Sequence, residues 1–293
     1  VLLPVIAAVP LLLGIPGLAI ADAYFEAVSG LTATGATALT GLDKLPPSLN
    51  LWRTELHWIG GLGIIVLAVA ILPMLGVGGR QLMKAEVPSP MKDSALTPRI
   101  AETARGLWMV YLAITVICIA ALKWAGMSWL DALTHAFSTV SLGGFSSHDA
   151  SFGFFDSPAL EAITIAFALI SGISYVTHFA ALSGRSLRPY RRDGEVPFYL
   201  GVLGASVLLI AVYLWQAGVY PEFATALRHA AFNTVSVATT LGYSSTDYSK
   251  WPFFAPLWML FLCSFVTCAG STGGGIKMMR AVILYKQVFR EIT

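Results

Sequence analysis

Charged residues are scarce in this chain of 293 residues. Asp, Glu, Lys and Arg together make up 12% of the sequence, whereas hydrophobic residues make up 56%. A soluble domain usually has about 25% charged residues, so this composition excludes an ordinary cytosolic protein and predicts an integral membrane protein. The net charge of +2 is close to zero, and no basic stripe indicates a nucleic-acid partner.

Cysteine is also rare, and catalytic or metal-binding patterns are missing. Cys118, Cys263 and Cys268 lie in apolar runs without a CxxC or Cys/His spacing, which predicts buried thiols rather than disulfides or a transition-metal site. No nucleophile–base pair stands out, and the two span-embedded carboxylates of an intramembrane aspartyl protease are absent. We therefore expect neither an enzyme nor a bound cofactor.

Long apolar segments alternate with shorter ones. A membrane-spanning helix needs about 20 mostly apolar residues, and four segments meet this length: 56–76, 106–126, 159–182 and 197–217. Prolines and glycines in segment 1–20 predict a partial or kinked span, and segment 252–268 stops before apolar sequence resumes at 278–289. Three helix-favouring segments are too short to cross: 21–34, 128–140 and 222–238. Each leads into a hydroxyl-rich stretch, which predicts re-entrant loops lined by protein or water.

Positive charge orients these segments. Residues 77–105, 183–196 and 277–293 carry most of the Lys and Arg residues, so we expect them on the cytoplasmic side. The side that holds the re-entrant segments is richer in acidic residues, including Asp43, Asp149 and Asp247. An acidic vestibule of this kind concentrates cations.

The three hydroxyl-rich stretches are copies of one pattern. Aligned on Gly35, Gly144 and Gly242, each reads S-x-x-[ST]-x-x-G-x-[ST], and each copy lies between apolar segments, which indicates an internal repeat. Glycine reaches positive φ without steric cost, so successive carbonyls can point the same way and replace the water shell of a cation. The alternative interpretation is that the glycines only allow close helix contacts.

Five motifs together resemble the Trk-type potassium-uptake membrane subunits of the Trk/Ktr/HKT cation transporter superfamily. They are "SGLTATGATALTGLDKLPPSLNLWR", "HWIGGLGIIVLAVAILPMLGVGG", "AFSTVSLGGFSSHD", "GYSSTDYSKWP" and "CAGSTGGGIK". The resemblance implies an all-α polytopic membrane protein. Its units of transmembrane helix, pore helix, filter loop and second transmembrane helix surround a central pore.

The resemblance also implies a function and its residues. It implies potassium uptake across the bacterial cytoplasmic (inner) membrane, with K⁺ as the transported ion, a homodimer and a cytosolic nucleotide-binding regulatory subunit. The implied K⁺-binding filter residues are Thr32, Ala33, Thr34, Gly35, Ser141, Leu142, Gly143, Gly144, Thr239, Thr240, Leu241 and Gly242. The implied gate loop comprises Gly270, Ser271, Thr272, Gly273, Gly274, Gly275 and Lys277.

We expect the chain to contain three of the four family repeats. The first, 1–79, is expected to be incomplete at its start, the second covers 106–184 and the third covers 197–293, with cytoplasmic linkers at 80–105 and 185–196. The chain starts at Val1 without a basic leader, so we expect a fragment rather than a signal peptide. A fragment without the fourth repeat is not expected to conduct selectively by itself.

Some interpretations stay open. A secondary transporter with broken helices, which couples Na⁺ or H⁺ to an organic substrate, is the alternative function. Lys277 either meters cations or anchors the chain at the membrane interface. The four arginines of the basic run either anchor the chain or dock a regulator or anionic lipid; they are Arg185, Arg188, Arg191 and Arg192. His135 and His229 are expected to be hydrogen-bonded structural residues.

Overall fold

The computed structural model describes residues 2–66 and 100–292, and all the regular structure in these ranges is helical. The first range holds α1 (Leu2–Gly14), α2 (Ile20–Leu31) and α3 (Pro47–Val66). The next helices are α6 (Ile100–Trp124), α7 (Trp129–Ser141), α8 (Pro158–Ser171), α9 (Tyr175–Ser183) and α10 (Arg188–Arg192). The last are α11 (Val196–Gln216), α12 (Phe223–Ala238), α13 (Phe254–Cys263) and α14 (Met278–Ile292). Single 3₁₀ turns at Leu42–Lys44, Ser151–Phe154 and Tyr248–Lys250 follow the three hydroxyl-rich stretches.

The spans in α6 and α11 agree with the sequence prediction. Ala104–Trp124 and Val196–Gln216 are long and apolar enough to cross a membrane. The predicted span 56–76 begins earlier than expected, because α3 starts at Pro47; its part beyond Val66 lies outside the described residues. Helix α1 ends at Gly14, so segment 1–20 is interrupted as expected.

The prediction of one continuous span over 159–182 is wrong. Helices α8 and α9 meet at an angle of 89°. The carbonyl of Gly172 accepts a hydrogen bond from the Cys268 N–H (3.0 Å), and the Tyr175 N–H donates to the Gly270 carbonyl (3.0 Å). Because the 268–270 segment satisfies these peptide groups, the helix can break inside the bundle without leaving them unpaired.

The three short helices that the sequence predicts are present as α2, α7 and α12. Each packs against the helix before it in the chain: α2 against α1, α7 against α6 and α12 against α11. Each long helix that follows a short one then packs against the next short helix, since α3 contacts α7 and α8 contacts α12. Successive units are therefore in contact, because a helix of one unit packs against the short helix of the next.

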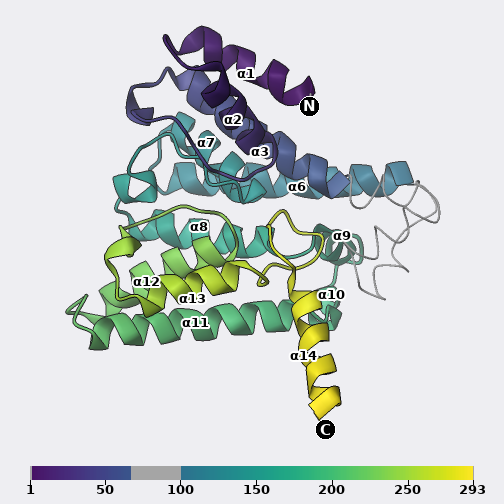
Figure 1. The fold of residues 1–293 in the computed structure, drawn as a ribbon. Helices are drawn as coiled ribbons and strands as arrows, with labels where there is room; N and C mark the ends of the chain where they lie inside the picture. Colours follow the sequence, from purple (N-terminus) through teal and green to yellow (C-terminus); the bar gives the residue numbers. More distant parts are fainter. Residues whose placement is uncertain (1, 67–99, 293) are drawn as a thin grey trace.

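The two ends of the bundle differ in their connections. The loops that follow α2, α7 and α12 gather at one end, and α9 and α10 lie at the other (Figure 1). The exposed arginines of the basic run lie on and next to α10, at the end opposite those loops. Helix α14 extends away from the bundle at this basic end (Figure 1).

Candidate functional site

The three stretches that follow the short helices share one backbone conformation. We call them glycine loop 1 (Thr32–Gly35), glycine loop 2 (Ser141–Gly144) and glycine loop 3 (Thr239–Gly242). In each loop φ is positive at the glycine and at the residue two before it. The values are 51° at Ala33, 78° at Gly35, 55° at Leu142, 84° at Gly144, 63° at Thr240 and 85° at Gly242. Alternation of residues with positive φ and residues without it turns successive carbonyls toward one side of the loop.

The first left-handed residue of each loop comes from the way its helix ends. The N–H groups of Thr34, Gly143 and Leu241 donate to the carbonyls of Ser29, Ser138 and Ser236, at 2.9, 2.9 and 2.8 Å. In the same helices the residue before donates to the carbonyl three residues back, so each end is a Schellman motif. The recurring serine of the sequence pattern is therefore the carbonyl that closes each helix.

The three loops touch one another through their backbones. A Cβ atom added to Gly35 would lie 2.0 Å from the Gly143 carbonyl oxygen, and one added to Gly144 would lie 2.1 Å from the Leu241 carbonyl oxygen. Such distances leave no space for a side chain. Loop 2 is thus held between loops 1 and 3, and the three glycines lie beside one another.

The local charge at the loops favours a cation. Helices α2, α7 and α12 all end at a glycine loop, so the partly negative C-terminus of each helix dipole faces the same region. The described residues contain no group of three His, Cys, Asp or Glu side chains that could hold a metal ion. The available ligands are therefore backbone and hydroxyl oxygens, which suit hard cations.

Glu26 and Arg53 form a buried ion pair behind loop 1 that the sequence did not predict. Arg53 Nε donates to Glu26 Oε1 at 2.7 Å, and both side chains are shielded from solvent. The Arg53 Nη1 atom also donates to the Ser146 carbonyl at 3.3 Å. Both charged residues lie within helices that are otherwise largely apolar. Because buried charges are retained where they are paired, these positions could have predicted the ion pair.

Tyr243 makes a matching contact between loops 3 and 2. Its hydroxyl donates to the Phe145 carbonyl at 3.2 Å. The Arg53 guanidinium lies over the Phe145 ring, 4.4 Å from its centroid. The two residues that follow Gly144 are consequently fixed from the side of loop 1 and from the side of loop 3.

The Gly270–Gly275 segment lies against the ends of the glycine loops. Thr272 Oγ1 donates to the Val140 carbonyl at 3.1 Å, and the Gly274 N–H donates to Thr240 Oγ1 at 2.8 Å. Lys277 Nζ donates to the Gly273 carbonyl, which places its positive charge next to the segment. The residues implied as a gate therefore lie next to the residues implied as a filter.

The start of this segment is anchored by residues from other helices. The Ala269 N–H donates to Glu195 Oε2 at 2.7 Å, and this carboxylate is buried. Gly270 has a φ of 77°, and an added Cβ would lie 2.9 Å from Ser174 Oγ. The anchor thus combines the beginning of α11 with the break between α8 and α9.

The outer loops of the first two units are joined by polar side chains. His148 Nδ1 lies 2.5 Å from Asp43 Oδ1, and His148 Nε2 lies 3.1 Å from Asp131 Oδ1. Asp149 Oδ1 accepts hydrogen bonds from the Gly41 and Leu42 N–H groups. We call the contact between Asp43 and His148 the outer clasp; it joins the loop that follows α2 to the loop that follows α7.

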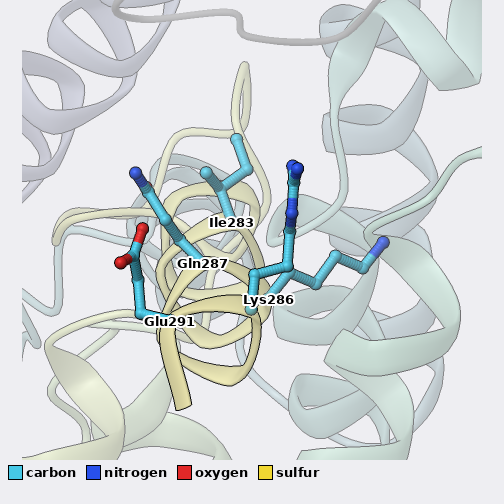
Figure 2. Close-up of a pocket in the computed structure, with 5 residues that line it drawn as sticks. Ile283, Lys286, Gln287 and Glu291 are labelled. Carbon is cyan, nitrogen blue, oxygen red and sulfur yellow. The ribbon is translucent and has the colours of Figure 1, made fainter. Parts of the chain in front are cut away.

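Two open hollows on the surface of the described residues are separate from the glycine loops. A hollow of about 420 Å³ is lined by residues of α14 alone, and Figure 2 shows Ile283, Lys286, Gln287 and Glu291 around it. Another hollow, of about 440 Å³, lies between α8 and α12 and is mostly apolar. Neither is lined by a residue of the three loops, so neither enlarges the candidate site.

Comparisons with known proteins agree with this geometry. A family model described as "TrkH: Cation transport protein" matches residues 1–293. The Trk system potassium uptake protein TrkH of Salmonella typhimurium is 51% identical over 94% of this chain and 57% of its own length. The protein of the same name from Halomonas elongata is 51% identical over 97% of this chain and 59% of its own length.

A solved structure gives the same result. The crystal structure of the potassium transporter TrkH from Vibrio parahaemolyticus matches with a TM-score of 0.88 and 42% identity, and it covers 99% of this chain and 59% of the crystallised chain. The chain thus spans less than two thirds of the length of these relatives.

Proposed function

Because the chain belongs to the TrkH family of cation transport proteins, we propose that it forms a pathway for potassium ion uptake across the membrane. The family places the chain in the inner membrane, and Ala104–Trp124 and Val196–Gln216 are long enough to cross it. Potassium is the transported ion in this proposal, and no cofactor takes part. The relatives are transporters by name, and we propose no enzymatic step.

The contact between the three glycine loops is the observation that carries the proposal. Carbonyl oxygens that point to one side can replace the water around a dehydrated potassium ion, and Gly35, Gly144 and Gly242 bring three such rows together. Each row adds the end of a helix dipole. A broken-helix transporter is built from two related halves, so three equivalent loops favour a pore.

We also propose that the Gly270–Gly275 segment is the gate. It lies beside Val140 and Thr240, where a segment crossing the pathway stops an ion that has passed the loops. Lys277 adds a positive charge close to that point and opposes cations until the segment moves. A cytosolic nucleotide-binding subunit that moves it, and a homodimer of the pore subunit, complete the proposal.

Potassium uptake by a hybrid protein tests the proposal. The hybrid joins this chain to the segments of the Salmonella typhimurium relative that the match leaves uncovered, and it is expressed in a host that lacks potassium uptake. Gly144→Ser places a side chain where an added Cβ lies 2.1 Å from the Leu241 carbonyl. Gly204→Ser is the matched control, because an added Cβ at Gly204 meets no atom within 4 Å.

The expected result is growth at low potassium with the hybrid and with Gly204→Ser, and loss of growth with Gly144→Ser at equal protein level. Uptake of the potassium analogue Rb⁺ is measured in the same cells. Equal Rb⁺ uptake by Gly144→Ser and Gly204→Ser would overturn the assignment of the loops. Failure of the hybrid to support any uptake would overturn the proposed function itself.

A further inference from the structure

A polar residue stands at the same place in all three short helices. Nine residues before Gly35, Gly144 and Gly242 are Glu26, His135 and Asn233. Their three side chains are shielded from solvent, with a relative exposure of 0% each. A carboxylate, an imidazole and an amide have little in common except the ability to make strong hydrogen bonds. Buried polar groups of this kind are retained where a partner satisfies them.

The partner is in each case a hydroxyl after the glycine, two residues after it in loops 1 and 2 and three residues after it in loop 3. Thr37 Oγ1 donates to Glu26 Oε1 at 2.9 Å. His135 Nε2 lies 2.9 Å from Ser146 Oγ, within hydrogen-bond distance.

Loop 3 repeats the arrangement with an amide. Asn233 Nδ2 donates to Ser245 Oγ at 3.0 Å, and the Ser245 N–H donates back to Asn233 Oδ1 at 3.3 Å. We call each of these contacts between a short helix and its post-glycine segment a brace. The brace is a structural repeat that the sequence pattern does not display, because its three helix residues differ in type.

The position of the brace gives it a mechanical consequence. The Schellman motif fixes the chain where it enters each glycine loop, and the brace fixes the chain where it leaves. The left-handed residues lie between these two points. Ala33, Leu142 and Thr240 carry a side chain at positive φ, a conformation that is unfavourable in an L-residue because Cβ crowds the following carbonyl oxygen. A loop held at one end only can relax from this conformation, whereas a loop held at both ends cannot.

The first brace reaches further than the other two. Glu26 Oε2 also accepts the Ala38 N–H at 3.1 Å, and Glu26 Oε1 accepts from Arg53. Arg53 Nη1 in turn donates to the Ser146 carbonyl, in the segment whose hydroxyl contacts His135. The carboxylate therefore connects the post-glycine segments of loops 1 and 2.

We propose that Glu26, His135 and Asn233 are positioning residues that set the spacing of the glycine-loop carbonyls and thereby the preference of the pathway for potassium over sodium. This inference rests on the proposed function, since it assigns the source of selectivity in that pathway. The braces touch no ion themselves. They act on the carbonyls through the backbone that follows each glycine.

Removal of the hydroxyl partner tests the braces with little disturbance. Thr37→Val, Ser146→Ala and Ser245→Ala each remove the hydroxyl contact of one brace and leave no charged side chain without its ion-pair partner. Glu26 keeps the Ala38 N–H and Asn233 keeps the Ser245 N–H. The first and third variants also lose the contacts of these hydroxyls with Arg53 and His229. The measurement is the ratio of Rb⁺ to Na⁺ uptake by the hybrid in cells, at matched protein level. Loss of one hydrogen bond of ordinary strength corresponds to about a three- to tenfold change in an equilibrium, so we expect the ratio to fall by about that factor in each variant.

Two controls separate selectivity from stability. Ser244→Ala changes the serine next to Ser245. The Ser244 side chain makes no hydrogen bond within residues 2–66 and 100–292, so we expect this variant to keep the ratio of Rb⁺ to Na⁺ uptake. Thr37→Ser keeps the hydroxyl, and we expect it to restore the ratio that Thr37→Val loses. A merely structural role lowers the protein level and the total uptake together, and leaves the ratio unchanged.

The outcomes distinguish this inference from the proposed function. A hybrid that prefers Rb⁺, with a reduced ratio in the three brace variants alone, supports both. A hybrid that prefers Rb⁺, with the same ratio in Thr37→Val, Ser146→Ala and Ser245→Ala as in Ser244→Ala, overturns the inference and leaves the proposed function standing. A hybrid that transports neither ion overturns both.

Discussion

The glycine loops and the Gly270–Gly275 segment are both irregular backbone inside a helix bundle, but they are held in different ways. Each loop is closed by bonds to its own short helix, at Ser29 in loop 1 and at the equivalent serines in loops 2 and 3. The segment is held by bonds to separate elements, at Val140, Tyr175 and Glu195 among others. Local closure makes a loop rigid, whereas separate attachments of about 1–3 kcal/mol each can be released together when helices shift.

We expect the largest difference between the two regions from a Gly→Ala substitution in each, because the added methyl group needs space that only one of them has. Gly35→Ala places a Cβ 2.0 Å from the backbone oxygen of Gly143, at a φ of 78°. An added Cβ at Gly274 meets only the Thr240 side chain, at 3.6 Å, which is ordinary van der Waals contact. A few kcal/mol of strain corresponds to about a hundredfold, so we expect Gly35→Ala to lower Rb⁺ uptake by about that factor and Gly274→Ala to retain much more. Equal losses would contradict the contrast.

The anchor at Glu195 is the next most sensitive point. Glu195→Gln replaces the carboxylate that accepts the Ala269 N–H by a neutral amide of the same shape. A charge-assisted hydrogen bond contributes about 1.5–3 kcal/mol, so we expect a lower melting temperature together with higher basal uptake of Rb⁺. Both are measured on the same membranes. A higher melting temperature with unchanged uptake would show that the carboxylate does not hold the segment.

A smaller effect is expected where the segment touches α7. Thr272→Val removes the hydroxyl that donates to the Val140 carbonyl and keeps the side-chain volume. Loss of about 1 kcal/mol is expected to raise basal Rb⁺ uptake by about fivefold without a change in the Rb⁺ to Na⁺ ratio. Thr225→Val on α12 is the matched control, since its side chain makes no hydrogen bond among the described residues. A changed ratio would assign Thr272 to selectivity instead.

The outer clasp gives the smallest effect, and it depends on pH. The hydrogen bond from His148 holds the pKa of Asp43 below its ordinary value of 3.8. A lowered pKa in the folded state stabilises the protein above the ordinary value, and this stabilisation is lost as the pH falls through the lowered pKa.

Asp43 is largely exposed, so the contribution is below about 1 kcal/mol. We expect Asp43→Asn to lower the melting temperature slightly at pH 7, and this difference to disappear as the pH falls through the lowered pKa of Asp43. A difference that persists at low pH would mean that the charge of Asp43 is not responsible.

Elements that depend on local sequence were predictable. Segments 21–34, 128–140 and 222–238 are too short to cross a membrane and end in glycine and hydroxyl residues, and they form α2, α7 and α12. His135 is hydrogen-bonded, as predicted. The gate segment was placed by resemblance, and the structure brings it close to the glycine loops.

Features that depend on distant contacts were not predictable. The break after Ser171 is held by bonds to Cys268 and Gly270, so the apolar run 159–182 reads as one span. Ala33, Leu142 and Thr240 gave no signal of positive φ, because these residue types rarely adopt it. The braces were not predicted because the repeat pattern was built from residues of the same type. The brace position instead holds a glutamate, a histidine and an asparagine.

A crystal structure of the hybrid grown in Rb⁺ shows where the ion binds, because the anomalous scattering of Rb⁺ locates it. We predict a Rb⁺ peak next to Gly35, Gly144 and Gly242, ligated by the carbonyl oxygens of the three loops. A Rb⁺ peak elsewhere in the bundle, with none beside these glycines, would contradict it.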